Sequence, residues 1–86
     1  MKYKLKTLQP FFEAVRLGKK RFEVRKNDRG YEEGDTLELI ECREQDSEPT
    51  GRAITCVVDY VLDGGRFGVE TGYVVMSICA IEEVTT

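Results

Sequence analysis

The chain has 86 residues, of which 41% are hydrophobic and 34% charged, and its formal net charge is −3. This composition excludes a disordered chain, and the length suits one domain, residues 1–86, built around a single modest core. The chain has no histidine and only three widely spaced cysteines, which excludes Ser-His-Asp and Cys-His catalysis and a four-ligand zinc site. We therefore expect neither a metal nor another cofactor. We expect Cys56 and Cys79, which lie in apolar runs, to behave as small hydrophobic residues.

The sequence shows no membrane-spanning or export segment. No window approaches the roughly eighteen apolar residues of a transmembrane helix. The residues from Met1 to Lys4 lack the apolar stretch of a secretory signal. We therefore expect a cytoplasmic protein with no membrane partner.

The amino-terminal residues predict a strand followed by a short helix. Residues 3–8 alternate between apolar and basic side chains, as a half-buried strand does. Pro10 suits the first turn of a helix, and Gly18 suits its carboxyl end. We expect three aromatic side chains of this region in the core: Phe11, Phe12 and Phe22.

The segment that follows the helix alternates again and predicts a second strand. Alternation places Phe22 and Val24 on one face, which we expect to pack on the core. Arg21, Glu23 and Arg25 then share the opposite face. One strand thus presents a carboxylate between two guanidinium groups.

The rest of the chain predicts three more strands, at residues 36–42, 52–62 and 74–81. Residues 43–51 form a polar loop, and residues 63–68 a glycine-rich hairpin turn. Five or six strands with one or two short helices indicate an α+β fold that is mostly β. A small, mostly antiparallel barrel fits this order better than a parallel α/β sheet.

Charge is distributed very unevenly along the chain. Residues 1–29 contain ten Lys or Arg and three Asp or Glu, whereas residues 30–86 contain three and thirteen. Seven of the basic side chains fall within residues 16–29. Such a cluster is explained either by internal ion pairs and solvated faces or by a basic patch that binds an anionic ligand.

The basic segment also contains a family motif. Gly18-x-Lys20-x-x-Glu23-x-Arg25 resembles the G-x-K-x-x-E-x-R signature of ASCH domains, which are members of the PUA-like superfamily. The elements that flank the motif follow the order of small ASCH-like proteins from about residue 5 to residue 81. The resemblance implies a small PUA-like pseudo-β-barrel with a cleft between barrel and helix that binds RNA or a nucleotide-like ligand.

The resemblance and the charges together define the candidate binding residues. Lys20 and Arg25 are the expected contacts to the anion, while Glu23 accepts hydrogen bonds from a base or orients the two cations. A wider rim is expected to extend this surface: Lys26, Asn27, Arg29, Arg52 and Tyr73. The alternative is an Arg-Glu-Arg ladder on a strand surface, which contributes little to binding.

Two further functions remain open. Some small ASCH relatives hydrolyse acetylated cytidine with a lysine, a threonine and a glutamate. Lys20 matches that lysine, but Glu23 stands where the threonine is expected. In this alternative Lys20 and Glu23 are catalytic, and Lys20 activates a water or Thr7. The third alternative is a protein-interaction module.

Overall fold

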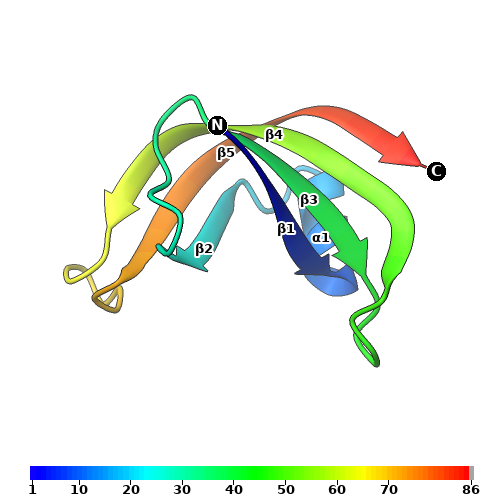
Figure 1. Ribbon diagram of the computed structural model, residues 1–86, viewed down its shortest axis with the longest axis horizontal. Helices are drawn as coiled ribbons and strands as arrows, with labels where there is room; N and C mark the ends of the chain where they lie inside the picture. The colour runs from blue at the N-terminus through cyan, green and yellow to red at the C-terminus, as the bar shows by residue number, and fades with distance from the viewer. Residues whose placement is uncertain (86) are drawn as a thin grey trace.

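The computed structural model describes residues 1–85, which form five strands and one helix (Figure 1). In chain order these are β1 (Lys2–Leu8), α1 (Gln9–Arg16), β2 (Phe22–Lys26), β3 (Thr36–Cys42), β4 (Pro49–Asp63) and β5 (Tyr73–Thr85). The expected strand order along the chain and the single early helix are confirmed. Pro49 to Gly51 open strand β4, although the sequence placed them in the preceding loop.

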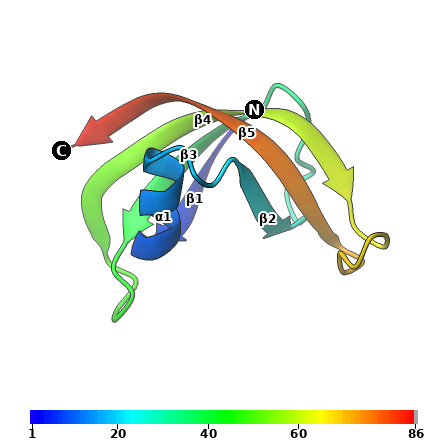
Figure 2. The same ribbon diagram turned by 180° about the vertical axis from the view of Figure 1, so that it is seen from behind.

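All five strands belong to one sheet, whose order is β1-β3-β4-β5-β2. The β1–β3 pair is parallel and the other three pairs are antiparallel. The sheet curls into an arch, with α1 on its concave side (Figures 1 and 2). The fold is therefore mostly β with one short helix, and the sheet forms half of a barrel. Its edge strands, β1 and β2, are not paired with each other.

The curl comes from the two long strands. The β4–β5 ladder shifts register between Thr55 and Cys56 and again between Val58 and Tyr60. Such bulges bend a strand and increase its twist. The bent strands bring the two ends of the sheet round toward each other, which leaves an open seam between β1 and β2.

The core lies between the concave face of the sheet and α1. Phe12 and Val15 are the buried side chains of the helix. They pack with buried side chains from the strands, including Leu5, Leu37, Leu39, Ile54, Val58, Val74 and Met76. The helix ends at Arg16, and Gly18 takes a φ of 75° just beyond it, a conformation that glycine adopts at little cost. The predicted carboxyl end is therefore confirmed.

The expected orientation of β2 is wrong. Phe22 and Val24 are 45% and 52% exposed, while Glu23 is only 2% exposed. Glu23 and Arg25 share a face as predicted, but that face is the concave one. The apolar-inward rule fails here because β2 is an edge strand beside the open seam, where cations neutralise the inward carboxylate. Phe11, 54% exposed, is also outside the core, contrary to the prediction.

Over residues 1–85, the fold contains no helix with the length and apolar character that a membrane span requires.

Candidate functional site

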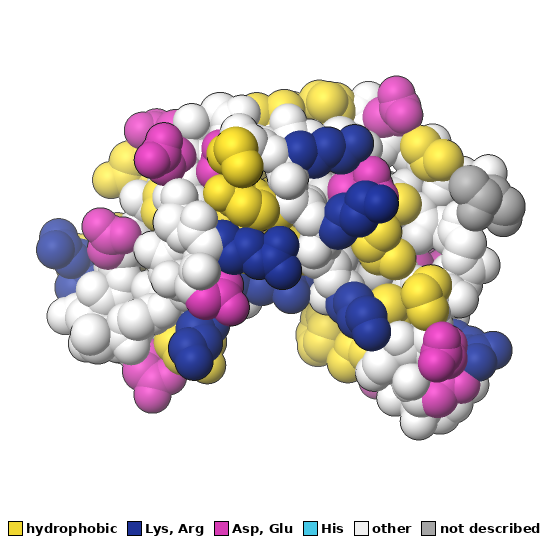
Figure 3. Space-filling model, in the orientation of Figure 1, with side chains coloured by type: hydrophobic (Ala, Val, Ile, Leu, Met, Phe, Trp, Pro, Cys, Tyr) yellow, Lys and Arg dark blue, Asp and Glu magenta, His cyan; other side chains and the backbone are white. Residues whose placement is uncertain are grey.

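A pocket of about 390 Å³ opens at the seam between β1 and β2. Its polar lining combines three residues of the predicted motif with two residues from β1: Lys20, Glu23, Arg25, Lys6 and Thr7. Leu8 and the exposed ring of Phe11 supply apolar lining from the junction of β1 and α1. In space-filling form, Lys and Arg side chains gather around the hollow beneath the arch (Figure 3).

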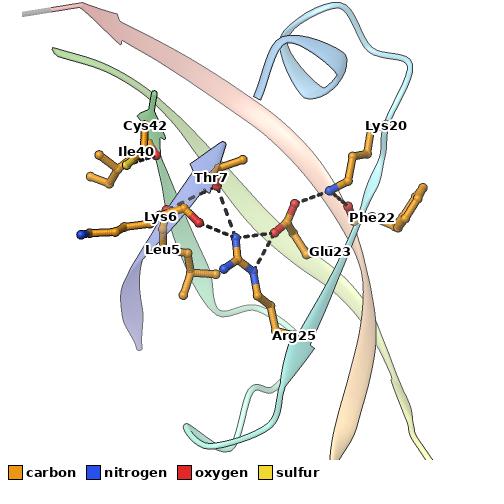
Figure 4. Close-up of polar contacts among 9 residues, drawn as sticks. All are labelled: Leu5, Lys6, Thr7, Lys20, Phe22, Glu23, Arg25, Ile40 and Cys42. Carbon is orange, nitrogen blue, oxygen red and sulfur yellow. Dashed lines mark hydrogen bonds and ion pairs between the residues drawn. The ribbon is translucent and has the colours of Figure 1, made fainter. Parts of the chain in front are cut away.

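Glu23 is the centre of the pocket's polar network. The Nζ of Lys20 donates to Glu23 Oε2 over 2.5 Å, and the Nε of Arg25 donates to Glu23 Oε1 over 2.9 Å (Figure 4). The Glu23 side chain is 3% exposed, so its charge is screened by these two cations rather than by water. A buried carboxylate of this kind needs both charge compensation and hydrogen bonds.

Arg25 bridges the seam that the backbone leaves open. Its Nη2 donates to the carbonyl oxygen of Lys6 over 3.0 Å and to Thr7 Oγ1 over 3.3 Å (Figure 4). These contacts join β2 to the edge of β1, where no strand is paired. Within residues 1–85, Arg25 Nη1 has no hydrogen-bond partner, so one nitrogen of the guanidinium remains available to a ligand.

Charge in the pocket is unbalanced. The two cations Lys20 and Arg25 surround the single carboxylate of Glu23, which leaves a formal excess of one positive charge. Lys20 also donates to the carbonyl oxygen of Phe22 over 2.7 Å, which fixes the ammonium group at the start of β2. The geometry therefore presents an ordered positive charge, together with a guanidinium edge, to whatever enters the seam.

Thr7 is a pocket residue that the sequence analysis named only as a group that Lys20 could activate, not as a binding residue. It is 3% exposed and lies on the inward face of β1, two residues after Leu5. A polar residue at an inward position of an alternating strand is the signal that could have found it. Its hydroxyl also donates to the carbonyl oxygen of Leu5 over 3.4 Å. Within residues 1–85, it has no hydrogen bond to Lys20 or Glu23.

Several predicted rim residues lie elsewhere. Lys26 and Tyr73 are register partners in the β2–β5 ladder, and they face the convex side of the sheet. Asn27 Oδ1 accepts a hydrogen bond from the backbone N–H of Tyr31, which holds the turn after β2. Arg29 stacks its guanidinium 5.6 Å from the ring centroid of Tyr3. Arg21, predicted on the face of Glu23, instead donates to the carbonyl oxygen of Gly18.

Arg52 belongs to a second polar cluster rather than to the pocket. Its Nη1 lies 3.7 Å from Glu41 Oε2 and its Nη2 lies 3.2 Å from Glu83 Oε1. The guanidinium also stacks 5.2 Å from the ring centroid of Phe12. Thr50 Oγ1 donates to Glu41 Oε1 over 2.5 Å. Each of these contacts ties the sheet or the helix together, so Arg52 has a structural role.

A comparison with protein families identifies the family of this chain. Residues 2–78 match the family model described as a domain of unknown function, DUF3850. The chain belongs to the DUF3850 family. No curated protein matches it. The region shared with DUF3850 includes every residue that lines the pocket, from Lys6 to Arg25.

The cysteines of this DUF3850 domain do not add a reactive group to the site. Burial, and then the nearby negative charge of Glu23, raises the pKa of the Cys56 thiol to about 11. Cys42 is buried as well, whereas Cys79 is exposed and so departs from the expected apolar environment. Among the described residues no cluster of three or more His, Cys, Asp or Glu side chains could hold a metal ion.

Proposed function

We propose that this DUF3850 domain binds RNA or a modified nucleotide in the pocket at the seam between β1 and β2. The observation that carries the proposal is the convergence of Lys20, Glu23 and Arg25, with Thr7, on one hollow that has an excess of positive charge. A surface ladder of charges would be exposed, but Glu23 is buried and Arg25 spans two strands. Anionic RNA or a nucleotide phosphate matches this charge.

The pocket chemistry suits a single unpaired nucleotide. The free edge of Arg25 can donate to a phosphate or to the acceptor edge of a base, while the buried Glu23 orients Arg25 and Lys20. Phe11, exposed beside the polar groups, offers a ring on which a base can stack. Stacking and edge recognition both need an unstacked base, so the expected ligand is single-stranded.

The resemblance to ASCH domains supports the same proposal. The residues that carry the motif, Lys20, Glu23 and Arg25, are the ones that line the pocket. We therefore propose that this DUF3850 chain is an ASCH-like member of the PUA-like superfamily and that the half-barrel corresponds to a PUA-like pseudo-barrel. An RNA ligand also fits the cytoplasmic location predicted from the sequence.

A fluorescence anisotropy titration tests the proposal. A labelled pool of short single-stranded RNAs is titrated with the wild-type domain at low salt, beside a duplex of the same length. We expect saturable binding of the single strands, weakened as salt rises. Lys20→Ala should weaken binding at least about fivefold, because a charged contact contributes about 1 kcal/mol or more.

Lys19→Ala is the matched control, since Lys19 is the neighbouring residue and removes the same charge without lining the pocket. It should change affinity less than about twofold. A folded wild-type domain that binds no RNA at low salt would exclude the proposal. Equal losses of affinity for the two lysine variants would indicate that RNA binds outside the pocket.

We propose hydrolysis of an acylated nucleoside as the second candidate function. It is favoured by Thr7, which places a hydroxyl in the same pocket as the Lys20–Glu23 pair, although Glu23 replaces the threonine of the resembling hydrolases. The hydroxyl is bonded to Arg25 and to the carbonyl oxygen of Leu5 rather than to a base that could deprotonate it. This arrangement ranks binding ahead of hydrolysis.

Incubation of the domain with N4-acetylcytidine separates the two candidates. Hydrolysis predicts acetate release that Glu23→Gln abolishes and that Thr7→Ala strongly lowers. Binding alone predicts no release by the wild type, combined with competition by the nucleoside in the RNA titration.

A further inference from the structure

A second hollow of about 390 Å³ opens beside the candidate binding pocket. It lies where β5 runs on past β2, whose ladder with β5 ends at Phe22 and Ser77 (Figure 2). We name this space the β5 hollow; its lining includes Lys20, Arg21, Asp59, Ile78 and Cys79. Lys20 lines both the pocket and the β5 hollow. A chain molecule bound in the pocket can therefore continue past Lys20 into the β5 hollow.

Arg21 supplies the β5 hollow with a guanidinium group that is mostly free. Its Nε donates to the carbonyl oxygen of Gly18 over 3.0 Å, which holds the side chain beside the end of α1. Among residues 1–85, the two Nη atoms of this exposed arginine have no hydrogen-bond or ion-pair partner. A guanidinium with two free nitrogens binds a phosphate through paired N–H···O bonds. The β5 hollow thus offers a phosphate contact next to Lys20.

Asp59 gives the β5 hollow a hydrogen-bond acceptor. The β4–β5 ladder shifts register between Val58 and Tyr60, so Asp59 is the extra residue of a β-bulge. Bulges re-aim side chains and are frequent beside binding sites, and here Asp59 lies at the wall of the hollow. In the part of the chain that the structure describes, its exposed carboxylate has no hydrogen bond or ion pair with another residue. A ligand that donates a hydrogen bond can therefore pair with it.

A phosphate contact and a carboxylate acceptor together favour a nucleotide whose base carries an amino group. The Asp59 carboxylate repels phosphate, so its favourable partner is the base rather than the RNA backbone. A carboxylate accepts a hydrogen bond from the exocyclic amino group of cytosine. Uracil presents a carbonyl oxygen at the same position, which leaves the carboxylate without a partner. Val15, Ile78 and Ala80 supply apolar lining against which the base can pack.

We propose that the β5 hollow binds the nucleotide adjacent to the one in the pocket and selects an amino base through Asp59. The inference rests on the proposed RNA binding and adds a second base position to it. The phosphate between the two nucleotides lies at Lys20 and Arg21, where the pocket and the hollow meet. The domain should therefore prefer cytosine over uracil in single-stranded RNA. A purely electrostatic effect of Asp59 would instead lower the affinity for both bases equally.

Anisotropy titrations with labelled oligo(C) and oligo(U) of equal length measure this preference at low salt. The wild-type domain should bind oligo(C) at least about fivefold more tightly than oligo(U). Asp59→Asn should reduce this ratio to less than about twofold, because the amide can also donate to the uracil oxygen. Asp28→Asn is the matched control and should keep the wild-type ratio, since Asp28 is also exposed but lines neither space. Arg21→Ala should weaken both RNAs equally, by about threefold.

Cys79 reports whether RNA occupies the β5 hollow. Its thiol is exposed in the free domain, and the residue lines this space. Saturating oligo(C) should slow the alkylation of Cys79 by iodoacetamide at least about threefold, because the bound nucleotide covers the thiol. An unchanged rate would show that the hollow stays empty and would overturn the proposal.

The base preference gives two further outcomes that overturn the proposal. One is a wild-type domain that binds both RNAs equally, and the other is an Asp59→Asn variant that keeps the wild-type preference. In either case, RNA binding that still depends on Lys20 leaves the proposed function standing. Binding of neither RNA by the folded domain excludes the proposed function and this inference together.

Discussion

Two clusters on the concave face are built from the same residue types but differ in charge. In the pocket, Glu23 is held by Arg25 and Lys20, which leaves one excess positive charge. In the second cluster, Arg52 lies between Glu41 and Glu83, which leaves one excess negative charge. Each cluster also contains a threonine that hydrogen-bonds within it. A buried Arg–Glu pair alone therefore does not indicate a binding site.

The two clusters are neighbours in the fold, so their charges can be compared in similar surroundings. Thr7 of the pocket and Glu41 of the second cluster are register partners on β1 and β3. Both glutamates are almost fully buried, at 2% and 4% exposure. What differs is the sign of the excess charge and the position in the fold: the pocket lies at the open seam between β1 and β2, whereas the Arg52 guanidinium stacks on the ring of Phe12. The balance of charge and the place at the open seam distinguish the candidate site from structural ion pairs.

The largest expected difference is between the two arginines. Arg25→Ala should weaken RNA binding at least about tenfold, because it removes a cation and a free donor from the pocket. Arg52→Ala should change RNA affinity less than about twofold. It should lower the free energy of unfolding by about 2 kcal/mol, since it leaves the buried Glu41 without its cation. Anisotropy titrations and urea unfolding of both variants measure the two effects.

Equal losses of RNA affinity for the two arginine variants would contradict the proposal that only the pocket cluster binds RNA. Arg25→Ala is itself expected to lower stability, because Glu23 keeps only Lys20. Binding is therefore measured well below the unfolding midpoint of each variant.

Variants of the two glutamates test the sign of the excess charge in the pocket rather than the size of a loss in RNA affinity. Glu23→Gln keeps the shape of the side chain but increases the excess positive charge of the pocket. The slope of log affinity against log salt should become steeper by about 0.7, the value for one additional phosphate contact on a single strand. Glu41→Gln should leave the slope unchanged. Titrations at four salt concentrations measure this slope for each variant. A shallower slope for Glu23→Gln would contradict the binding of an anion in the pocket.

The threonines should separate binding from stability with a smaller effect. Thr7→Val and Thr50→Val each remove one hydroxyl that is hydrogen-bonded to a charged side chain. Each should lower the free energy of unfolding by about 1 kcal/mol. RNA affinity should fall about two- to threefold for Thr7→Val and remain unchanged for Thr50→Val. A loss of affinity in Thr50→Val alone would reverse the assignment of the two clusters.

The smallest effect concerns cysteine reactivity and serves as a folding check for all these variants. Cys79 is exposed, whereas Cys42 and Cys56 are buried. The pKa of Cys56, raised to about 11, leaves it on the order of 0.1% thiolate at pH 8. Iodoacetamide should therefore label one thiol per folded chain at that pH. Mass spectrometry that finds three rapid labels in a variant would show that its core has opened.

The sequence predicted the fold well where local patterns determine it. The strand at residues 36–42 has the predicted bounds, and the turn predicted at residues 63–68 begins at Asp63, the last residue of β4, and continues into the connection to β5. The shared face of Glu23 and Arg25 followed from alternation alone. Gly18 ended the helix as expected because a residue there must take a positive φ.

The errors came from contacts between distant parts of the chain. Alternation divides the side chains of β2 between two faces but does not say which face is inside. That choice depends on the seam with β1, where Arg25 reaches the carbonyl oxygen of Lys6. The role of Thr7 depends on the same long-range contact. The pairing of Arg52 with Glu41 and Glu83 likewise requires the β3–β4–β5 ladders, which no local motif reports.

The most direct test of the binding site is an NMR titration of the ¹⁵N-labelled domain with a short single-stranded RNA. The pocket account predicts that the largest chemical-shift changes fall on the backbone amides of Thr7, Glu23 and Arg25 and on the Arg25 Nε–H. The amides around Glu41 and Arg52 should remain unchanged, because their cluster repels the ligand. Shifts centred on the second cluster, or no shifts at saturating RNA, would contradict the account.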